Sequence, residues 1–238
     1  MCFLMFKKKN SGRDWSTRPC QIETTELAAV PEPIGGWPKN STVYFYVDDV
    51  NCYGSSSEEK LLLWATTNVK STIAEIISYM KDRGLKLEQS YIGNGVQVNI
   101  KFYYQPFTKA IANIESLSKG YESLKGCDSD FIVNSKKISG LVPGQGTNYN
   151  GLVQAQEINR VMKSADCWIN LYTLQLALQA SEAAALQIFK RLFWHEAGHW
   201  ACGLRDDVKG KRPGIMVYSY LSLPPSKSEE LTIDWLYN

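Results

Sequence analysis

The strongest constraint on this chain is a helix-forming stretch, residues 180–202, that carries both of its histidines. The stretch is rich in Ala, Leu and Gln and contains no proline, which favours one long helix. Gly203 follows and is expected to end that helix in the left-handed conformation. His195 and His199 are four positions apart, so they lie on one helix face about one turn apart and can reach the same ion.

Residues 195–199 read His-Glu-Ala-Gly-His, which places Glu196 directly after the first histidine. Imidazole nitrogens are common ligands of Zn²⁺, and a catalytic zinc site keeps one position open for water. Zinc lowers the pKa of that water towards about 7, so the neighbouring carboxylate could accept its proton. The alternative is a core helix with two structural histidines and a solvated Glu196. Gly198 disfavours it, because glycine within a helix costs about 1 kcal/mol and indicates a requirement other than stability.

Two histidines leave zinc short of a protein ligand, and acidic residues just beyond the helix can supply it. Gly203 turns the chain off the helix, and Asp206 follows three residues later, where its side chain can fold back under the metal. Asp207 is the second candidate. Zinc binds such carboxylates readily.

Three other residues compete for this role. Glu229 and Glu230 could each supply a downstream carboxylate, but they also open an expected helix, where acidic side chains favour the helix dipole. Cys202 shares a helix face with the histidines, but it lies seven residues from His195, about 10 Å along the axis. A buried free cysteine is therefore expected.

Residues 195–206 resemble the extended metzincin motif HExxHxxGxxH, in which Asp replaces the last His in some members. The family places its glycine three residues after the second histidine, whereas Gly203 stands four residues after His199. One extra helical residue shifts the helix exit by about 1.5 Å and 100°. The interval from Gly203 to Asp206 is that of the family, so the resemblance implies Zn²⁺ bound by His195, His199 and Asp206.

Two later segments add to the resemblance. Residues 213–218 are similar to the Met-turn of metzincins, with Met216 beneath the zinc ligands and Tyr218 where some members stabilise the oxyanion. Residues 229–237 resemble the C-terminal helix of matrixin-like members. The resemblance implies a zinc-dependent endopeptidase for protein or peptide substrates, with Glu196 as general base. Two alternatives stay open: a non-catalytic zincin-fold binding module, and a gluzincin-type peptidase with a downstream glutamate ligand.

The rest of the chain predicts an α+β fold, because strands concentrate in the first half and a long helix in the second. The resemblance adds a zincin-like arrangement: a twisted mixed sheet, two long helices and a small C-terminal subdomain. The patterns predict strands at 43–47, 96–102 and 167–172, helices at 57–80 and 228–237, weak helical periodicity at 152–162 and loop at 126–150.

At 238 residues the chain suits one substantial domain, placed at 37–238. Residues 1–36 are irregular, end in turn-forming residues and read as a propeptide or linker. Cys20 is expected to be a surface or disulfide cysteine rather than a propeptide cysteine that blocks zinc.

The formal net charge of +2 gives no reason to expect nucleic acid or another polyanion as partner. No apolar run approaches the roughly 20 residues that span a bilayer. The protein is expected to be a monomer. The start, MCFLMFKKKN, is a poor signal peptide because its charge follows its apolar part. The six cysteines form no CxxC pair, and their even number permits disulfides without requiring them. The redox compartment, and with it the localisation, therefore stays open, although the family resemblance is compatible with secretion.

Overall fold

The structure is a computed structural model, and it describes a little more than half of the chain. The described residues are 15–19, 33–48, 56–92, 95–103, 151–170, 178, 181–206, 214–216, 223 and 225–238.

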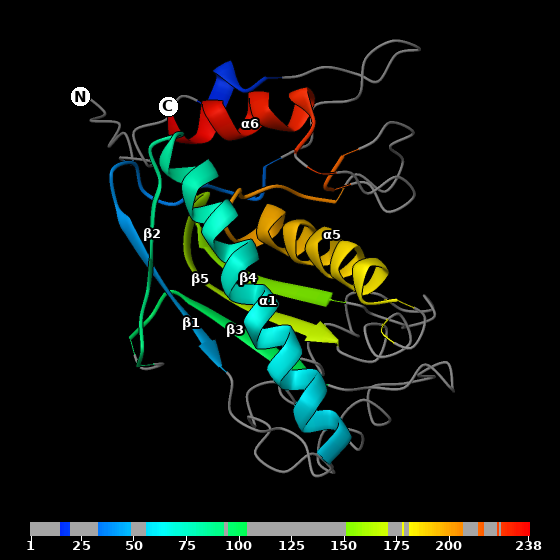
Figure 1. The fold of residues 1–238 in the computed structure, drawn as a ribbon. Helices are drawn as coiled ribbons and strands as arrows, with labels where there is room; N and C mark the ends of the chain where they lie inside the picture. The colour runs from blue at the N-terminus through cyan, green and yellow to red at the C-terminus, as the bar shows by residue number, and fades with distance from the viewer. Residues whose placement is uncertain are drawn as a thin grey trace, which may run out of the picture.

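A five-stranded mixed sheet forms the framework, with strand order β2-β1-β3-β5-β4 (Figure 1). Strand β1 pairs in parallel with β2 and β3, β3 pairs in parallel with β5, and β4 runs antiparallel to β5 at the edge. The bounds are β1 Thr42–Asp48, β2 Lys86–Gln89, β3 Val98–Tyr103, β4 Gly151–Ile158 and β5 Val161–Asn170. With the helices described next, this sheet confirms the α+β class.

Three long helices and one short 3₁₀ turn complete the described structure. They are η1 Trp15–Thr17, α1 Ser56–Lys81, α5 Glu182–Trp200 and α6 Lys227–Tyr237. The three helices agree with the sequence-based ranges, and their signals are local. Helix α1 stops shortly before Gly84, which has φ 85°, and the Ser181 side chain caps the first turn of α5. Helix α6 begins with a capping box between Ser226 and Glu229.

The helix suggested by the weak periodicity at 152–162 is wrong, because this region forms the β4–β5 hairpin. Asn159 and Arg160 connect the two strands, with φ of 53° and 64°. Positive φ at both central residues is the geometry of a two-residue type I′ turn, whose twist matches that of the flanking strands. Arginine is not a usual residue for this position, so no typical turn motif marks the hairpin in the sequence. The strands expected at 43–47 and 96–102 are confirmed as β1 and β3. Residues 167–170 of the expected strand 167–172 form the end of β5, and 126–150 and 171–172 lie outside the described residues.

Helices α1 and α5 lie side by side over the sheet (Figure 1). Trp64 of α1 meets Phe189 of α5 edge to face, with ring centroids 5.7 Å apart. Phe45 of β1 contacts Trp200 at the end of α5, with ring centroids 6.2 Å apart. The core between these layers is apolar and almost fully buried, and it fixes α5 relative to the strands. Its largest members are Trp37, Phe45, Ile76, Met80, Leu85, Ile100, Met162, Phe189, Phe193 and Trp200.

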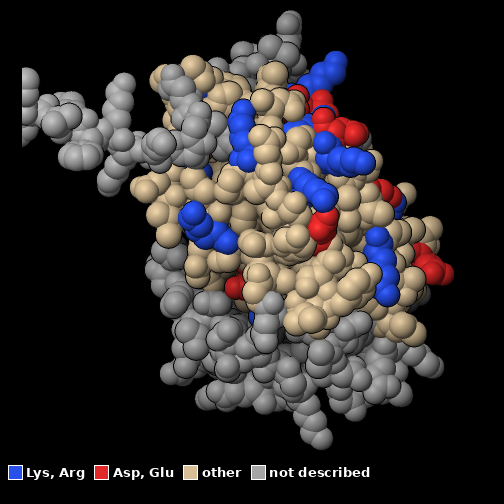
Figure 2. All heavy atoms as spheres, turned by 90° about the vertical axis from the view of Figure 1, so that its left-hand side faces the viewer, with Lys and Arg blue, Asp and Glu red and all other residues tan. Residues whose placement is uncertain are grey.

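The β2 edge of the molecule carries charges of both signs. On the face shown in Figure 2, basic and acidic side chains are intermingled, and Lys86 pairs with Glu88 on β2 itself. Charged side chains on an edge strand discourage pairing with another chain. None of the helices in the described ranges combines the length and apolarity needed to cross a lipid bilayer.

Candidate metal centre

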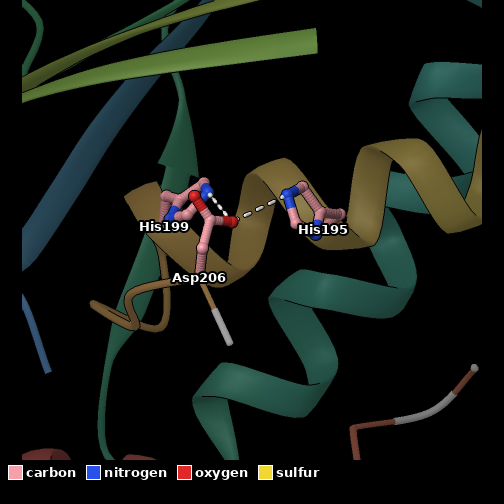
Figure 3. A group of neighbouring side chains, drawn as sticks. All are labelled: His195, His199 and Asp206. Carbon is pink, nitrogen blue, oxygen red and sulfur yellow. Dashed lines mark ion pairs between the residues drawn. The ribbon is translucent and has the colours of Figure 1, made fainter. Parts of the chain in front are cut away.

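The three side chains that the sequence singled out as metal ligands come together in space. The Nε2 atoms of His195 and His199 each lie 3.3 Å from Oδ1 of Asp206 (Figure 3). Within the described residues these three form the group of His, Cys, Asp and Glu side chains that could hold a metal ion, with one ligand atom from each within 4.8 Å of the others. Both imidazoles project from one face of α5, and the carboxylate approaches from the segment that follows it.

The last turn of α5 is wider than an α-helical turn. The carbonyl oxygen of Ala197 accepts hydrogen bonds from the backbone N–H groups of Ala201 and Cys202, at 2.8 and 2.9 Å. The N–H of Leu204 reaches back six residues to the carbonyl of Gly198, at 2.8 Å. A π-type turn of this kind holds one residue more than an α-turn. The wide turn therefore takes up the extra residue of the motif, and the acidic segment still meets the histidines.

Gly203 ends this turn in a conformation that other residues rarely adopt. Its φ is 71°, and a Cβ atom at this position would collide with the carbonyl oxygen of Gly35. The N–H of Ile34 donates to the carbonyl of Gly203 at 2.7 Å, and Pro33 forms an isolated bridge with Leu204. Part of the segment assigned to the N-terminal region thus packs against the loop that follows α5.

Both imidazoles are held through their Nδ1 atoms. His195 Nδ1 lies 2.7 Å from the carbonyl oxygen of Ile215, and His199 Nδ1 lies 2.9 Å from that of Leu204. A carbonyl oxygen only accepts hydrogen bonds, so Nδ1 carries the proton in both rings. The Nε2 atom of each ring then faces Asp206. In metal-binding histidines, one ring nitrogen commonly donates to a carbonyl group and the other binds the metal.

Lone pairs on two nitrogens and one carboxylate oxygen repel one another unless a proton or a cation lies among them. Burial lowers the pKa of His195, but the hydrogen bond to Asp206 and the charges of Glu196 and Asp206 outweigh it and raise this pKa to about 9. Burial acts to raise the pKa of Asp206, but hydrogen bonds and charges from the two imidazoles lower it far below its ordinary value. A divalent cation would serve in place of the protons, and two imidazoles with one carboxylate are a donor set that suits zinc.

A buried glutamate supports the carbonyl that holds His195. The Glu229 carboxylate accepts hydrogen bonds from the N–H groups of Ile215, Met216 and Ser226, at 3.1, 2.8 and 2.7 Å. Through these bonds α6 fixes the segment whose Ile215 carbonyl orients His195. The sequence placed Glu229 at the start of a helix but gave no sign of this contact.

The helix glycine within the motif now has a structural reason. A Cβ atom at Gly198 would overlap the sulfur of Met216 and come within 3.2 Å of Ile215 Cδ1. Met216 is fully buried. The glycine lets the methionine lie directly against α5 at position 198.

Glu196 is buried beside the histidines, with 3% of its surface exposed. Burial raises the pKa of its carboxyl above the ordinary value, while the charges of His195 and His199 oppose the rise. A raised pKa makes a carboxylate a stronger base than an ordinary one.

The competing ligands have other partners. Glu230 pairs with Arg83 at 2.8 Å, and Glu229 binds backbone N–H groups as described above. Both open α6, as the sequence predicted. The thiol of Cys202 is buried and free, with its sulfur 3.7 Å from that of Met80. This agrees with the buried free cysteine expected from the sequence.

Several predicted residues lie outside the described part of the chain. They are Asp207, the second candidate for the third ligand, Tyr218, the candidate oxyanion stabiliser, and Cys20. Comparisons of the chain with protein-family models, with curated proteins and with solved structures found no match.

Proposed function

We propose that this chain is a zinc-dependent endopeptidase of the metzincin type. The observation that carries the proposal is the convergence of two Nε2 atoms on one oxygen of Asp206, with both Nδ1 atoms donating to carbonyl groups. Metal-binding histidines commonly donate one ring nitrogen to a carbonyl and bind the metal through the other, which is the geometry that these two rings offer. The proposal includes a zincin-like fold, which the mixed sheet, the paired helices α1 and α5 and the buried Met216 below Gly198 support.

In the proposed reaction His195, His199 and Asp206 hold the metal. Bound zinc would supply a Lewis acid that polarises the scissile carbonyl and acidifies water. Glu196 follows the first ligand along α5, and its carboxylate takes the proton of the attacking water and passes it to the leaving amine. Tyr218 keeps the role that the resemblance implies, as a hydrogen-bond donor to the developing oxyanion.

Replacing Glu196 by glutamine tests the catalytic part of the proposal. Glutamine has nearly the same shape but cannot accept the proton, so hydrolysis of casein or of a peptide library should fall by about 10²–10⁴-fold. Zinc content should stay at the wild-type level, because Glu196 is not a ligand. Glu182→Gln, at the other end of α5, is the matched control and should leave both quantities unchanged.

Two outcomes would count against the proposal. Full activity of Glu196→Gln would remove Glu196 as the base. A wild-type protein that binds zinc but cleaves nothing in a broad peptide library would favour the non-catalytic binding module instead.

A further inference from the structure

The Glu196 carboxyl group lies against the first residue of β4. A Cβ atom added at Gly151 would overlap Oε1 of Glu196 and lie 2.7 and 2.9 Å from its Cδ and Cγ. Real Cβ atoms essentially never approach a neighbour closer than 3.0 Å. Any side chain at position 151 is therefore incompatible with the observed position of the Glu196 carboxylate.

The strand register independently directs position 151 towards α5. Gly151 lies opposite Ile169, and Val153 lies opposite Cys167. Residues opposite one another, and residues two apart along a strand, share one face of the sheet. Ile169 and Cys167 are both fully buried, and besides burial, the charge of Glu196 also raises the pKa of the Cys167 thiol. Position 151 thus belongs to the face of the β4–β5 hairpin that adjoins Glu196.

We propose that Gly151 is a positioning residue for Glu196: the missing side chain at the start of β4 leaves the space in which the carboxylate stands beside the metal ligands. The catalytic consequence rests on the proposed function, whereas the steric contact does not. Gly198 provides a contrast on the same helix, because a Cβ there would meet Met216 and not Glu196. One glycine makes room for the general base and the other for the methionine.

Gly151→Ala should displace the carboxylate without touching a metal ligand. We expect the zinc stoichiometry to be unchanged, kcat for peptide hydrolysis to fall by at least about 10²-fold, and KM to change little. The overpacked variant should also lose roughly 3–10 °C in Tm. Wild-type kcat and Tm in Gly151→Ala would overturn the proposal.

A double-mutant cycle with Glu196→Ala separates this contact from a general structural effect. Alanine at position 196 removes Cγ, Cδ and Oε1, the three atoms nearest to a Cβ at 151. With zinc in excess throughout, Gly151→Ala should lower Tm much less in the Glu196→Ala background than in wild type. Gly198→Ala, the matched control, should lower Tm equally in both backgrounds, because its neighbour is Met216.

Each result of the cycle either supports or refutes the contact between position 151 and the Glu196 side chain. Equal Tm losses for Gly151→Ala in the two backgrounds would refute the contact. If Gly151→Ala alone does not fold, the Glu196→Ala background must restore folding, and failure to do so also counts against the proposal. If the cycle shows coupling but wild type hydrolyses no peptide, the contact stands and the endopeptidase function fails.

Discussion

The two ring nitrogens of each histidine have separate tasks. Nδ1 of His195 and Nδ1 of His199 donate to main-chain carbonyls, which fixes both ring orientations and leaves Nε2 for the ligand. A proton and a metal ion then compete for the same Nε2 atom. Metal affinity is therefore expected to depend on pH.

The direction of this dependence follows from the pKa of about 9 for His195. Below that pH a metal ion must displace the proton on Nε2, and above it the lone pair is free. The apparent Kd for zinc should fall by about tenfold for each unit of pH between 7 and 9 and then level off. Competition titrations with a chromogenic chelator at constant ionic strength would measure this. Asp206→Asn removes a negative partner of His195, so its curve should level off at lower pH. A zinc affinity that is constant from pH 7 to 9 would contradict the proposed protonation.

Much of the candidate site is local in the sequence, which is why the convergence of its three side chains could be predicted. Helical spacing places His195 and His199 together, and a short turn brings Asp206 to them. The supports could not be predicted in the same way. The carbonyls of Leu204 and Ile215 are main-chain groups that every residue type carries, so no sequence pattern marks them.

At the scale of whole elements, α6 contacts the candidate metal centre through the short segment 214–216. Glu229→Gln keeps the size of the side chain, but its amide nitrogen cannot accept the N–H groups that the carboxylate binds. The Ile215 carbonyl should then hold His195 less firmly, and zinc affinity should fall by about 10–100-fold. Glu230→Gln, one position along the same helix, breaks the pair with Arg83 instead and should leave the affinity near wild type. Isothermal titration of both variants, each first shown to be folded by circular dichroism, would measure the difference. Equal affinities would show that Glu229 has no positioning role.

The elements that the sequence predicted correctly carry local signals. Helices α5 and α6 have caps and an apolar face, and β1 and β3 have alternating or β-branched residues. Strand β2 was missed because only Leu87 of its four residues is buried, and its pairing with residues 42–45 of β1 is non-local. Residues 152–162 were misread for a related reason: pairing across the Asn159–Arg160 turn outweighed a weak helical periodicity.

At the scale of the whole molecule, the N-terminal segment contacts distant parts of the chain. Residues 33–36 pair with the loop after α5 and with the start of β5. Trp15, from η1, packs edge to face on Trp235 of α6, with ring centroids 5.0 Å apart. These described contacts cross the sequence-based boundary at residue 36.

A bound metal ion would link α5 to the segment after it and stabilise the fold as any ligand of the native state does.

The metal content of the purified, folded protein tests this interpretation most directly. Wild type and Glu230→Ala should each bind one equivalent of zinc, removable by a chelator with a fall in Tm, whereas Asp206→Ala should bind zinc weakly or not at all. A folded wild-type protein that takes up no transition metal would contradict the proposed centre. Loss of zinc in Glu230→Ala with retention in Asp206→Ala would contradict the ligand set.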